Sequence, residues 1–449
     1  MKQVDLLIIG GSAGGILSAN TARKIYKDKK ITVIRDQKTV MVPCGIPYIY
    51  GTLNDTSKNV IPDKVLTDNQ IELIVDKVAS INKKEKYAET TNNGKIYYDR
   101  LIVATGSLPA MPPVPGNGLE NVFSVYKNET YLRDMHKKME NFSDIVVIGG
   151  GFIGVEFSEQ FRMNGKNVTL IQRGDKCLRR NFDPEFSDEV ENLLRENGIT
   201  VKTNAKIKEF IGDGKVTGVV LQNGETIKAD AVLLGAGVRP NSNLAKEAGL
   251  TIKEDDSIMV NEYMRTSDPN IFAAGDCAEK VCFFTRENVP ILLASTAALE
   301  AKVAGYNAFK NKLTRTNKGT INAFSTKIFG RAFGAAGLTE KQALEKNFDI
   351  ATGNFTVMDK HPGSLPTTST IHIKLIFSNY SGVIMGGQIS GGDSVGEMIN
   401  VISIAVQQGM TAADLNTFQA ATHPLLTASP IAYPINAAAM DAIGKINLS

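Results

Sequence analysis

The stretch VDLLIIGGSAGGILSANTARKI, residues 4–25, joins a run of strand-forming apolar residues directly to a glycine-rich turn and a helical pattern. A second β-rich run, ITVIRD, follows it at residues 31–36. Together the two segments predict a βαβ unit of the size that binds a dinucleotide. Glycine is needed at such a turn because the backbone must bend tightly and approach a pyrophosphate at the start of the helix.

The same pattern occurs a second time. DIVVIGGGFIGVEFSEQF, residues 144–161, is followed by the β-rich run VTLIQRGD at residues 168–175. This copy has the full G-x-G-x-x-G spacing at Gly149, Gly151 and Gly154. One motif of this kind is weak evidence, but two copies, each between a strand and a helix, predict two separate dinucleotide sites.

The first copy departs from the motif at its middle position. Gly10 and Gly15 hold the outer positions, whereas Ser12 stands between them. Two further apolar runs, residues 98–107 and 270–279, end in small residues. Ligands of a doubly wound sheet bind beyond the carboxyl ends of its strands. The residues expected at that edge are Thr105, Gly106, Gly275 and Asp276.

The order of these segments predicts three domains in an α/β chain. The first dinucleotide fold, doubly wound and three-layered, is expected to comprise residues 1–112 and 244–318, with the second inserted at 113–243. From about Ala323 the texture changes to alternating strand patterns and then a helix. We therefore expect a separate α+β domain over residues 319–449.

Bulk composition excludes several classes of function. The 449 residues include 50 Lys and Arg against 47 Asp and Glu, a net charge of +3 with both signs interspersed. We therefore expect neither a nucleic-acid-binding surface nor a membrane span. We expect a cytoplasmic location. Four cysteines, none in a zinc-like pair of pairs, predict neither a structural metal nor a disulfide scaffold.

By these residues the chain resembles the flavin-dependent pyridine nucleotide-disulfide oxidoreductases. Within them it is most similar to the single-cysteine branch of coenzyme A-disulfide reductases, NADH oxidases and NADH peroxidases. The motifs that carry the resemblance extend over almost the whole chain: IIGGSAGG, PCGIPY, LIVATGS, VVIGGGFIGVE, GAGVRPN and AAGDCA. The resemblance implies FAD at the first βαβ unit, NADH or NADPH at the second, and a carboxyl-terminal dimerisation domain.

The resemblance also assigns residues to each cofactor. It places Asp276 on the ribityl hydroxyls of FAD, Glu156 near the nicotinamide, and Phe152 where relatives have an aromatic gate over the flavin. The expected FAD contacts are Gly10, Gly11, Ser12, Ala13, Gly14, Gly15, Arg35, Asp36, Pro43, Thr105, Gly106, Gly275 and Asp276. The expected NAD(P)H contacts are Gly149, Gly151, Phe152, Ile153, Gly154, Glu156, Gln172, Arg173 and Gly237.

Cys44 lies alone between two prolines in MVPCGIPYIY, residues 41–50. The resemblance implies that it is the redox thiol facing the flavin, activated by the start of a helix near Gly45. Two-cysteine relatives have a partner five positions earlier, where this chain has Thr39. Cys44 is therefore expected to cycle as a mixed disulfide, a persulfide or a sulfenic acid. Cys277 and Cys282 follow the flavin aspartate and are expected to be structural.

The nucleotide preferences remain open. A dinucleotide fold usually places a carboxylate on the ribose about 20 residues after the last glycine. The first unit has Arg35 and Asp36 there, so FAD adenosine is held either by Asp36 or without a carboxylate. The second has Gln172 and Arg173, neither of them acidic, so NADPH becomes plausible as well as NADH.

Two features bear on coenzyme A and on proton transfer. Relatives that bind coenzyme A use basic residues on the first helix, where this chain has Arg23, Lys24 and Lys27, although a solvated helix face explains these charges equally well. The segment ATHPLLTASP resembles the histidine–proline segment of two-cysteine relatives, whose histidine is an acid/base supplied across the dimer. His423 is therefore a candidate for proton transfer in a homodimer, with His361 a second.

Three functions fit this pattern. The first passes electrons from NAD(P)H through FAD and Cys44 to a small disulfide, persulfide or polysulfide, with coenzyme A as a possible carrier or adduct. The second is an NAD(P)H oxidase or peroxidase in which Cys44 becomes a sulfenic acid and the electron acceptor is O₂ or H₂O₂. The third is a flavin redox sensor whose NADH-bound state alters its contacts. The sequence does not distinguish the acceptors, because the first two functions need the same flavin and thiol.

Overall fold

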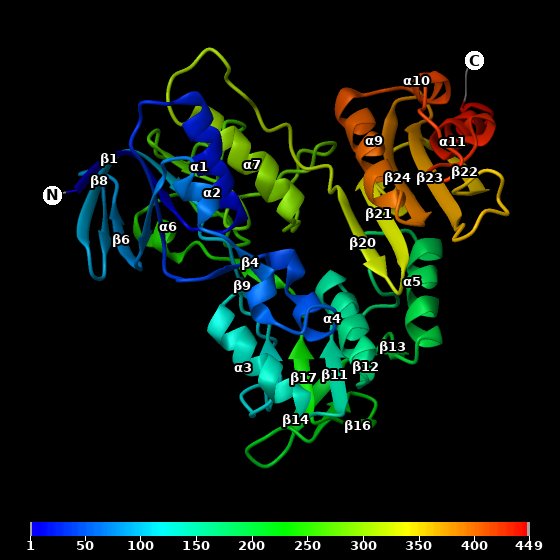
Figure 1. The fold of residues 1–449 in the computed structure, drawn as a ribbon, viewed down its shortest axis with the longest axis horizontal. Coiled ribbons are helices and arrows are strands. Elements are labelled where there is room, and N and C mark those ends of the chain that lie inside the picture. The colour runs from blue at the N-terminus through cyan, green and yellow to red at the C-terminus, as the bar shows by residue number, and fades with distance from the viewer. Residues whose placement is uncertain (1, 447–449) are drawn as a thin grey trace.

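The computed structural model describes residues 2–446, which form three packed regions, each built on a sheet of its own (Figure 1). The first region holds a seven-stranded sheet in the order β5-β2-β1-β8-β7-β6, with β19 beside β8. Its strands are β1 (Lys2–Ile9), β2 (Ile31–Arg35), β5 (Glu72–Val75), β6 (Val78–Asn82), β7 (Tyr87–Thr90), β8 (Gly94–Val103) and β19 (Ile271–Ala273). Its helices are α1 (Ala13–Ile25), α2 (Lys64–Thr67), α6 (Asn243–Glu247) and α7 (Ala294–Asn307).

The central strands of this sheet are parallel and apolar on both faces, as expected for strands covered by helices. Leu6 lies opposite Ile31 on β2 and opposite Arg100 on β8. Helices α1 and α7 pack against each other over this sheet. The carboxyl ends of β1, β8 and β19 therefore open at one edge, between the starts of the two helices.

The second region contains a five-stranded parallel sheet in the order β10-β17-β11-β12-β13 and a small antiparallel sheet, β14-β15-β16. The strands are β10 (Val122–Ser124), β11 (Asp144–Ile148), β12 (Asn167–Ile171), β13 (Thr200–Lys202), β14 (Ile207–Ile211), β15 (Gly218–Leu221), β16 (Thr226–Lys228) and β17 (Ala231–Leu234). The helices are α3 (Glu129–Glu140), α4 (Phe152–Met163) and α5 (Pro184–Glu196). The chain enters and leaves this region through one antiparallel ribbon, β9 (Ser107–Pro109) with β18 (Val238–Pro240).

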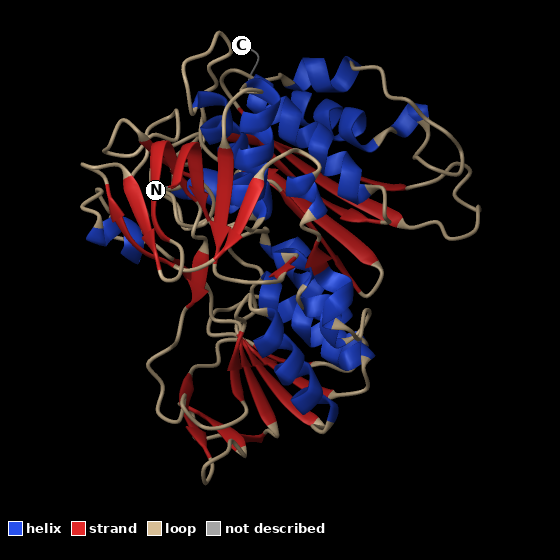
Figure 2. Cartoon of the chain, turned by 60° about the vertical axis from the view of Figure 1, so that its left-hand side comes forward, coloured by secondary structure: helices blue, strands red, loops and turns tan. Residues whose placement is uncertain are grey.

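The third region is an antiparallel sheet in the order β20-β21-β24-β23-β22. The strands are β20 (Phe324–Ile328), β21 (Arg331–Gly337), β22 (Ile350–Met358), β23 (Thr370–Ser378) and β24 (Ile384–Gly391). The helices are α8 (Glu340–Glu345), α9 (Val395–Gln408), α10 (Ala412–Thr417) and α11 (Pro434–Ile443). Helix α9 packs on β21 and β24, and α11 on β22 and β23. Figure 2 shows this helix-on-sheet packing from the side.

Charged groups join the third region to the second. The Lys374 ammonium, on β23, lies 3.1 Å from Asp183 and 2.6 Å from Glu185 at the start of α5, and it also pairs with Glu340. Its side chain is 8% exposed, and these carboxylates raise the pKa of Lys374 against the effect of burial. The contact fixes α5 of the second region against the carboxyl-terminal sheet.

The predicted fold class is confirmed: two doubly wound α/β units, the second inserted in the first, precede an α+β unit. The expected limits at 112, 243 and 318 stay predictions. No helix within residues 2–446 is both long enough and apolar enough to cross a membrane.

Candidate active site

The two glycine turns have the same local geometry. Gly10 and Gly149, at the ends of β1 and β11, have φ angles of +118° and +104°, which only glycine adopts readily. A Cβ on Gly15 would lie 1.8 Å from the Gly10 oxygen, and one on Gly154 would lie 1.7 Å from the Gly149 oxygen. Each helix can therefore start directly against its strand only because these positions carry no side chain.

Both helix starts leave backbone N–H groups available for an anion. Ser12 and Gly151 stand at the N-caps of α1 and α4, and neither supplies a side-chain capping hydrogen bond. A Cβ on Gly151 would meet nothing within 4 Å. An uncapped helix start facing open space fits a pyrophosphate, so the residues present fit FAD and NAD(P)H.

Several of the other residues predicted for FAD lie beside the first turn. Gly14 lies against Ala274 and Gly275 at the end of β19, and a Cβ on Gly10 would collide with Ala104 at the end of β8. The Asp276 carboxylate accepts hydrogen bonds from the Ser107 hydroxyl at 2.7 Å and from Lys127 at 3.1 Å. The predicted FAD edge is thus assembled from three strand ends.

Arg35 and Gln172 occupy equivalent positions in the two units. A Cβ on Gly11 would lie 2.5 Å from the Arg35 side chain, and one on Gly150 would lie 3.2 Å from Gln172. The buried Arg35 guanidinium donates to both carboxylate oxygens of Asp63, and Asp36 beside it is exposed. Arg35 therefore stabilises this loop. Asp36 remains as the candidate for contact with the adenosine of FAD.

Gln172 is engaged in the same way. Its amide oxygen accepts the Gly150 N–H at 3.3 Å, and its amide nitrogen donates to the Lys176 carbonyl. Arg173 is exposed and has no hydrogen-bond or ion-pair partner among residues 2–446. Gly237 (φ +103°) lies in the loop after β17, which approaches Gly149. The second site thus contains a free cation where many dinucleotide folds have an acid.

Cys44 is exposed on a loop that differs from the expectation. Residues 43–50, all described, form two short 3₁₀ turns, Pro43–Gly45 and Pro47–Tyr50, so the predicted helix near Gly45 is wrong. Pro47 interrupts the run because its ring removes a backbone donor. A Cβ on Gly45 would lie 2.0 Å from the Asn59 amide oxygen. The loop around the thiol is therefore fixed by close packing, and no α-helix begins there.

Two carboxyl groups on α4 face this loop. Burial raises the pKa of Glu156 to about 7, and the charge of Glu159 adds to this, while a 2.8 Å hydrogen bond from Thr326 on β20 opposes it. Burial also raises the pKa of Glu159, which accepts the Phe329 N–H. Glu156 can therefore hold or release a proton near neutral pH.

Tyr48 lies within electrostatic range of the thiol and of both acids. Burial raises the pKa of Tyr48 to about 12, and the charges of Glu156, Glu159 and Cys44 raise it further in the same direction. The phenol therefore stays protonated at neutral pH and can donate a hydrogen bond. The four groups form one cluster where the Cys44 loop meets α4.

Phe152 and Ile153 are the first two residues of α4. The Phe152 ring packs edge-on against Phe324 of β20, with ring centroids 4.7 Å apart. Ala13 holds the equivalent first position of α1. The expected aromatic gate therefore lies in contact with the carboxyl-terminal region.

The other three cysteines are buried, and burial raises the pKa of Cys177 to about 12 and also raises that of Cys277. Cys277 and Cys282 form no disulfide with each other. Within residues 2–446, no group of three or more His, Cys, Asp and Glu side chains is placed to hold a metal ion.

His423 lies on an exposed loop of the third region. Its hydrogen bonds stay within that loop. The ring Nδ1 accepts the Leu425 N–H at 3.3 Å, and the backbone N–H of His423 donates to the Thr427 hydroxyl. His361 joins the same loop through the Thr427 carbonyl. Neither histidine makes a hydrogen bond to Cys44 or Glu156 within the described chain.

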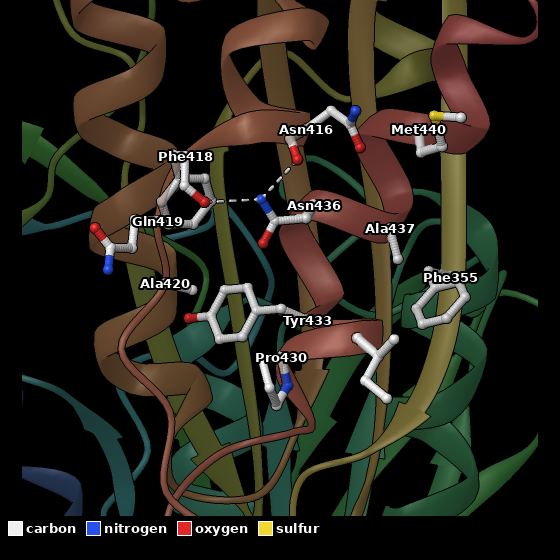
Figure 3. A pocket seen from close by; sticks show the side chains of 11 residues that line it. Phe355, Asn416, Phe418, Gln419, Ala420, Pro430, Tyr433, Asn436, Ala437 and Met440 are labelled. Atoms are coloured by element: carbon white, nitrogen blue, oxygen red, sulfur yellow. Dashed lines mark hydrogen bonds between the residues drawn. The ribbon is translucent and has the colours of Figure 1, made fainter.

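A cavity of about 620 Å³ lies beside this loop, between α10 and α11 (Figure 3). Asn436 lines the cavity and donates hydrogen bonds to the Leu415, Asn416 and Phe418 carbonyls. Phe355, Tyr433 and Met440 supply apolar walls. None of the predicted site residues lines this cavity, so it is separate from the Cys44 cluster.

Sequence reasoning missed several groups and overvalued one. Glu159 lies three residues after Glu156 on the same helix, a spacing that could have identified it. Thr326, Asn59 and Lys127 come from distant segments, and no local pattern indicates them. Arg23 donates to the carbonyls of Tyr26, Lys27, Lys29, Asn69 and Gln70, so it holds the end of α1 instead of facing a ligand.

Taken together, the paired nucleotide turns and the thiol loop define a flavin- and nicotinamide-dependent oxidoreductase. The chain belongs to the pyridine nucleotide-disulphide oxidoreductases: that family's model matches residues 4–301, and the model of its dimerisation domain matches residues 324–431. The protein is accordingly an enzyme that uses FAD and NAD(P)H.

The relatives include both NADH oxidases and sulfur reductases, the two kinds of enzyme expected from the sequence. The NADH oxidase of Methanocaldococcus jannaschii is 32% identical over 98% of this chain and 99% of its own length. The NAD(P)H coenzyme A polysulfide/persulfide reductase of Pyrococcus horikoshii is 32% identical over 91% of this chain and 92% of its own length. Among solved structures, an NAD-dependent persulfide reductase from A. fulgidus matches with a TM-score of 0.89 and 31% identity, covering 98% of this chain and 83% of that one.

Proposed function

We propose that the enzyme passes electrons from NAD(P)H through FAD and Cys44 to a small disulfide, persulfide or polysulfide. One observation carries the proposal: Cys44 is the exposed cysteine, Thr39 stands where two-cysteine relatives have a partner, and the other three cysteines are buried. The second sulfur must therefore come from the substrate. The sulfur-reducing relatives support the same assignment.

The proposed reaction balances as follows. The Cys44 thiolate attacks a disulfide RSSR, forming a mixed disulfide and releasing RS⁻. Cleavage of the mixed disulfide to a second RS⁻ and the Cys44 thiolate takes two electrons, which FAD, when bound, would supply from NAD(P)H. The sum is NAD(P)H + RSSR + H⁺ giving NAD(P)⁺ and two RSH.

The neighbouring groups handle charge and protons. Tyr48 can donate a hydrogen bond to sulfur as negative charge develops, because its phenol stays protonated. Glu156 can take up or give a proton beside the nicotinamide. His423 is proposed to protonate the leaving thiolate from the partner subunit of a homodimer, because within residues 2–446 of its own subunit it hydrogen-bonds to neither Cys44 nor Glu156.

Coenzyme A derivatives are the proposed sulfur carriers. With Arg23 bound to backbone carbonyls, the exposed Lys24 on α1 and the exposed Lys27 in the turn after it are the basic groups that remain for an anionic nucleotide. A cytoplasmic location is proposed as well, since the four cysteines are all unpaired, as in a reducing compartment.

The second candidate is an NADH oxidase or peroxidase, and the similarity to the Methanocaldococcus jannaschii enzyme favours it. The deciding experiment compares NADH consumption with coenzyme A disulfide, polysulfide, H₂O₂ and O₂, the first three without oxygen. Sulfur substrates should exceed O₂ and H₂O₂ in kcat/KM by at least tenfold. If O₂ or H₂O₂ wins by that margin, the oxidase or peroxidase assignment replaces the first.

A further inference from the structure

A buried ion pair lies directly behind the predicted FAD edge. The Lys280 ammonium and a Glu300 carboxylate oxygen are 3.1 Å apart, and their side chains are 2% and 1% exposed. Lys280 follows the turn after β19, and Glu300 lies in the middle of α7. Burying two charges carries a desolvation cost that is recovered only through good geometry and further hydrogen bonds.

Those further hydrogen bonds converge on one residue, Gly275. The Glu300 carboxylate accepts the Gly275 N–H at 2.9 Å. The Lys280 ammonium donates to the Gly275 carbonyl at 2.7 Å and to the Ala278 carbonyl at 2.6 Å. The pair therefore holds both polar groups of a single peptide residue.

Gly275 sits at a crowded junction. Its φ is +80°, and a Cβ there would contact Ala297 of α7 at 3.8 Å and the Cα of Gly14 on α1 at 4.0 Å. The turn is thus confined between the starts of the two helices. A displacement of Gly275 would move the strand end, the neighbouring Asp276 and the α1 glycine turn relative to one another.

The pair also acts on Asp276 electrically. Burial acts to raise the pKa of Asp276, but the Lys127 ammonium, the Ser107 hydroxyl and the Lys280 ammonium together lower it below its ordinary value. Burial raises the pKa of Glu300 to about 7 against the opposing Lys280 charge, and the Asp276 charge adds to the rise. The three groups are therefore coupled.

We propose that Lys280 and Glu300 are positioning residues for FAD: they fix the Gly275–Asp276 turn in its cofactor-binding shape and set the charge behind it. Removing either one weakens FAD binding and changes the flavin reduction potential. This inference rests on the proposed contact between Asp276 and FAD, but not on the identity of the electron acceptor.

The test measures FAD release on serial dilution of the purified holoenzyme, followed by free-flavin fluorescence, together with the two-electron midpoint potential. The variants are Lys280→Met, Glu300→Gln, the double Lys280→Met/Glu300→Met, and Asp276→Ala. Glu279→Gln is the matched control, because Glu279 is adjacent in sequence but pairs with the more exposed Lys253 at 3.1 Å.

Each single variant should raise the FAD dissociation constant at least tenfold, and the control should stay within twofold. Glu300→Gln, which keeps the positive charge, should raise the midpoint potential, and Lys280→Met should lower it. A tenfold difference between the affinities for oxidised and reduced FAD corresponds to about 30 mV.

The double variant separates positioning from stability. It should recover melting temperature relative to the single variants, because no charge stays buried alone, yet keep the weakened FAD binding, because Gly275 lacks its partners. If the double variant binds FAD as the wild type does, or if the singles lower only the melting temperature, the inference is overturned. If Asp276→Ala also binds FAD normally, the proposed FAD contact itself is wrong.

Discussion

At the scale of the residue, Cys44 is the group on which the proposed chemistry depends. Cys44→Ser should still bind FAD and still be reduced by NAD(P)H, because the glycine turns and Glu156 are unchanged. Disulfide reduction should fall by several orders of magnitude, because a hydroxyl cannot form a mixed disulfide. Oxygen consumption should survive or rise, because reduced flavin reacts with O₂ without a thiol.

Stopped-flow flavin reduction and steady-state turnover, measured side by side, distinguish these steps. Cys282→Ser is the matched control, because that thiol is buried away from the site. Full disulfide reductase activity in Cys44→Ser would make Cys44 a packing residue and leave another exit for the electrons.

Glu156 should make the stability of the protein depend on pH. Its pKa is about 7 in the folded chain against an ordinary 4.5. Between these values the folded state binds more protons than the unfolded state, so stability falls as pH rises through this window. The full difference corresponds to about 3 kcal/mol, reached above pH 7.

Glu156→Gln should therefore gain up to about 3 kcal/mol over the wild type at pH 8 and nothing at pH 4.5. Urea unfolding at both pH values and at one FAD concentration measures the two differences. An equal gain at both pH values would trace the effect to packing and not to the buried charge.

Arg173 should govern the choice of nicotinamide. Neither Gln172 nor Arg173 is acidic, and Arg173, which has no partner among residues 2–446, can pair with a 2′-phosphate, so we expect NADPH within about tenfold of NADH, about 1.4 kcal/mol. Arg173→Ala should lower kcat/KM for NADPH and leave that for NADH within twofold. A wild-type preference for NADH above a hundredfold contradicts this expectation.

At the scale of the element, the 3₁₀ turns around Cys44 are held by close packing. Gly45→Ala would drive a Cβ into the Asn59 amide, so we expect a loss of about 1–3 kcal/mol and slower alkylation of Cys44. Gly396→Ala is the control, because a Cβ there meets nothing within 4 Å and alanine favours helix α9. Equal stability of the two variants would show that the Asn59 side chain moves aside without cost.

The elements also show what the sequence could and could not predict. The strands and glycine turns were predictable, because the apolar runs and the glycines that mark them lie within short stretches of the sequence. The turns at Pro47 were missed, because a proline-interrupted apolar run has no clear period. The partners of Glu156 and Asp276 come from residues far away in the chain, and nothing near either acid indicates which they are.

At the scale of the whole molecule, we expect a homodimer with shared active sites. Leu426 and Ile431 are 68% and 95% exposed beside His423, an apolar surface that a second copy would cover. If His423 acts across the dimer, mixing Cys44→Ser with His423→Ala subunits restores one intact site per mixed dimer. Mixtures should then exceed both parents in disulfide reduction, whereas a histidine acting within its own subunit restores nothing.

The ribbon β9–β18 has a consequence for the ancestry of the chain. Val238 pairs with Pro109, so the two ends of the inserted region meet at a single point. The insert repeats the glycine geometry of its host, from Gly10 and Gly15 to Gly149 and Gly154. This architecture is the one expected of a gene duplication in which one copy was inserted into a loop of the other. The ribbon marks the insertion point, where another nucleotide-binding domain could replace the present one.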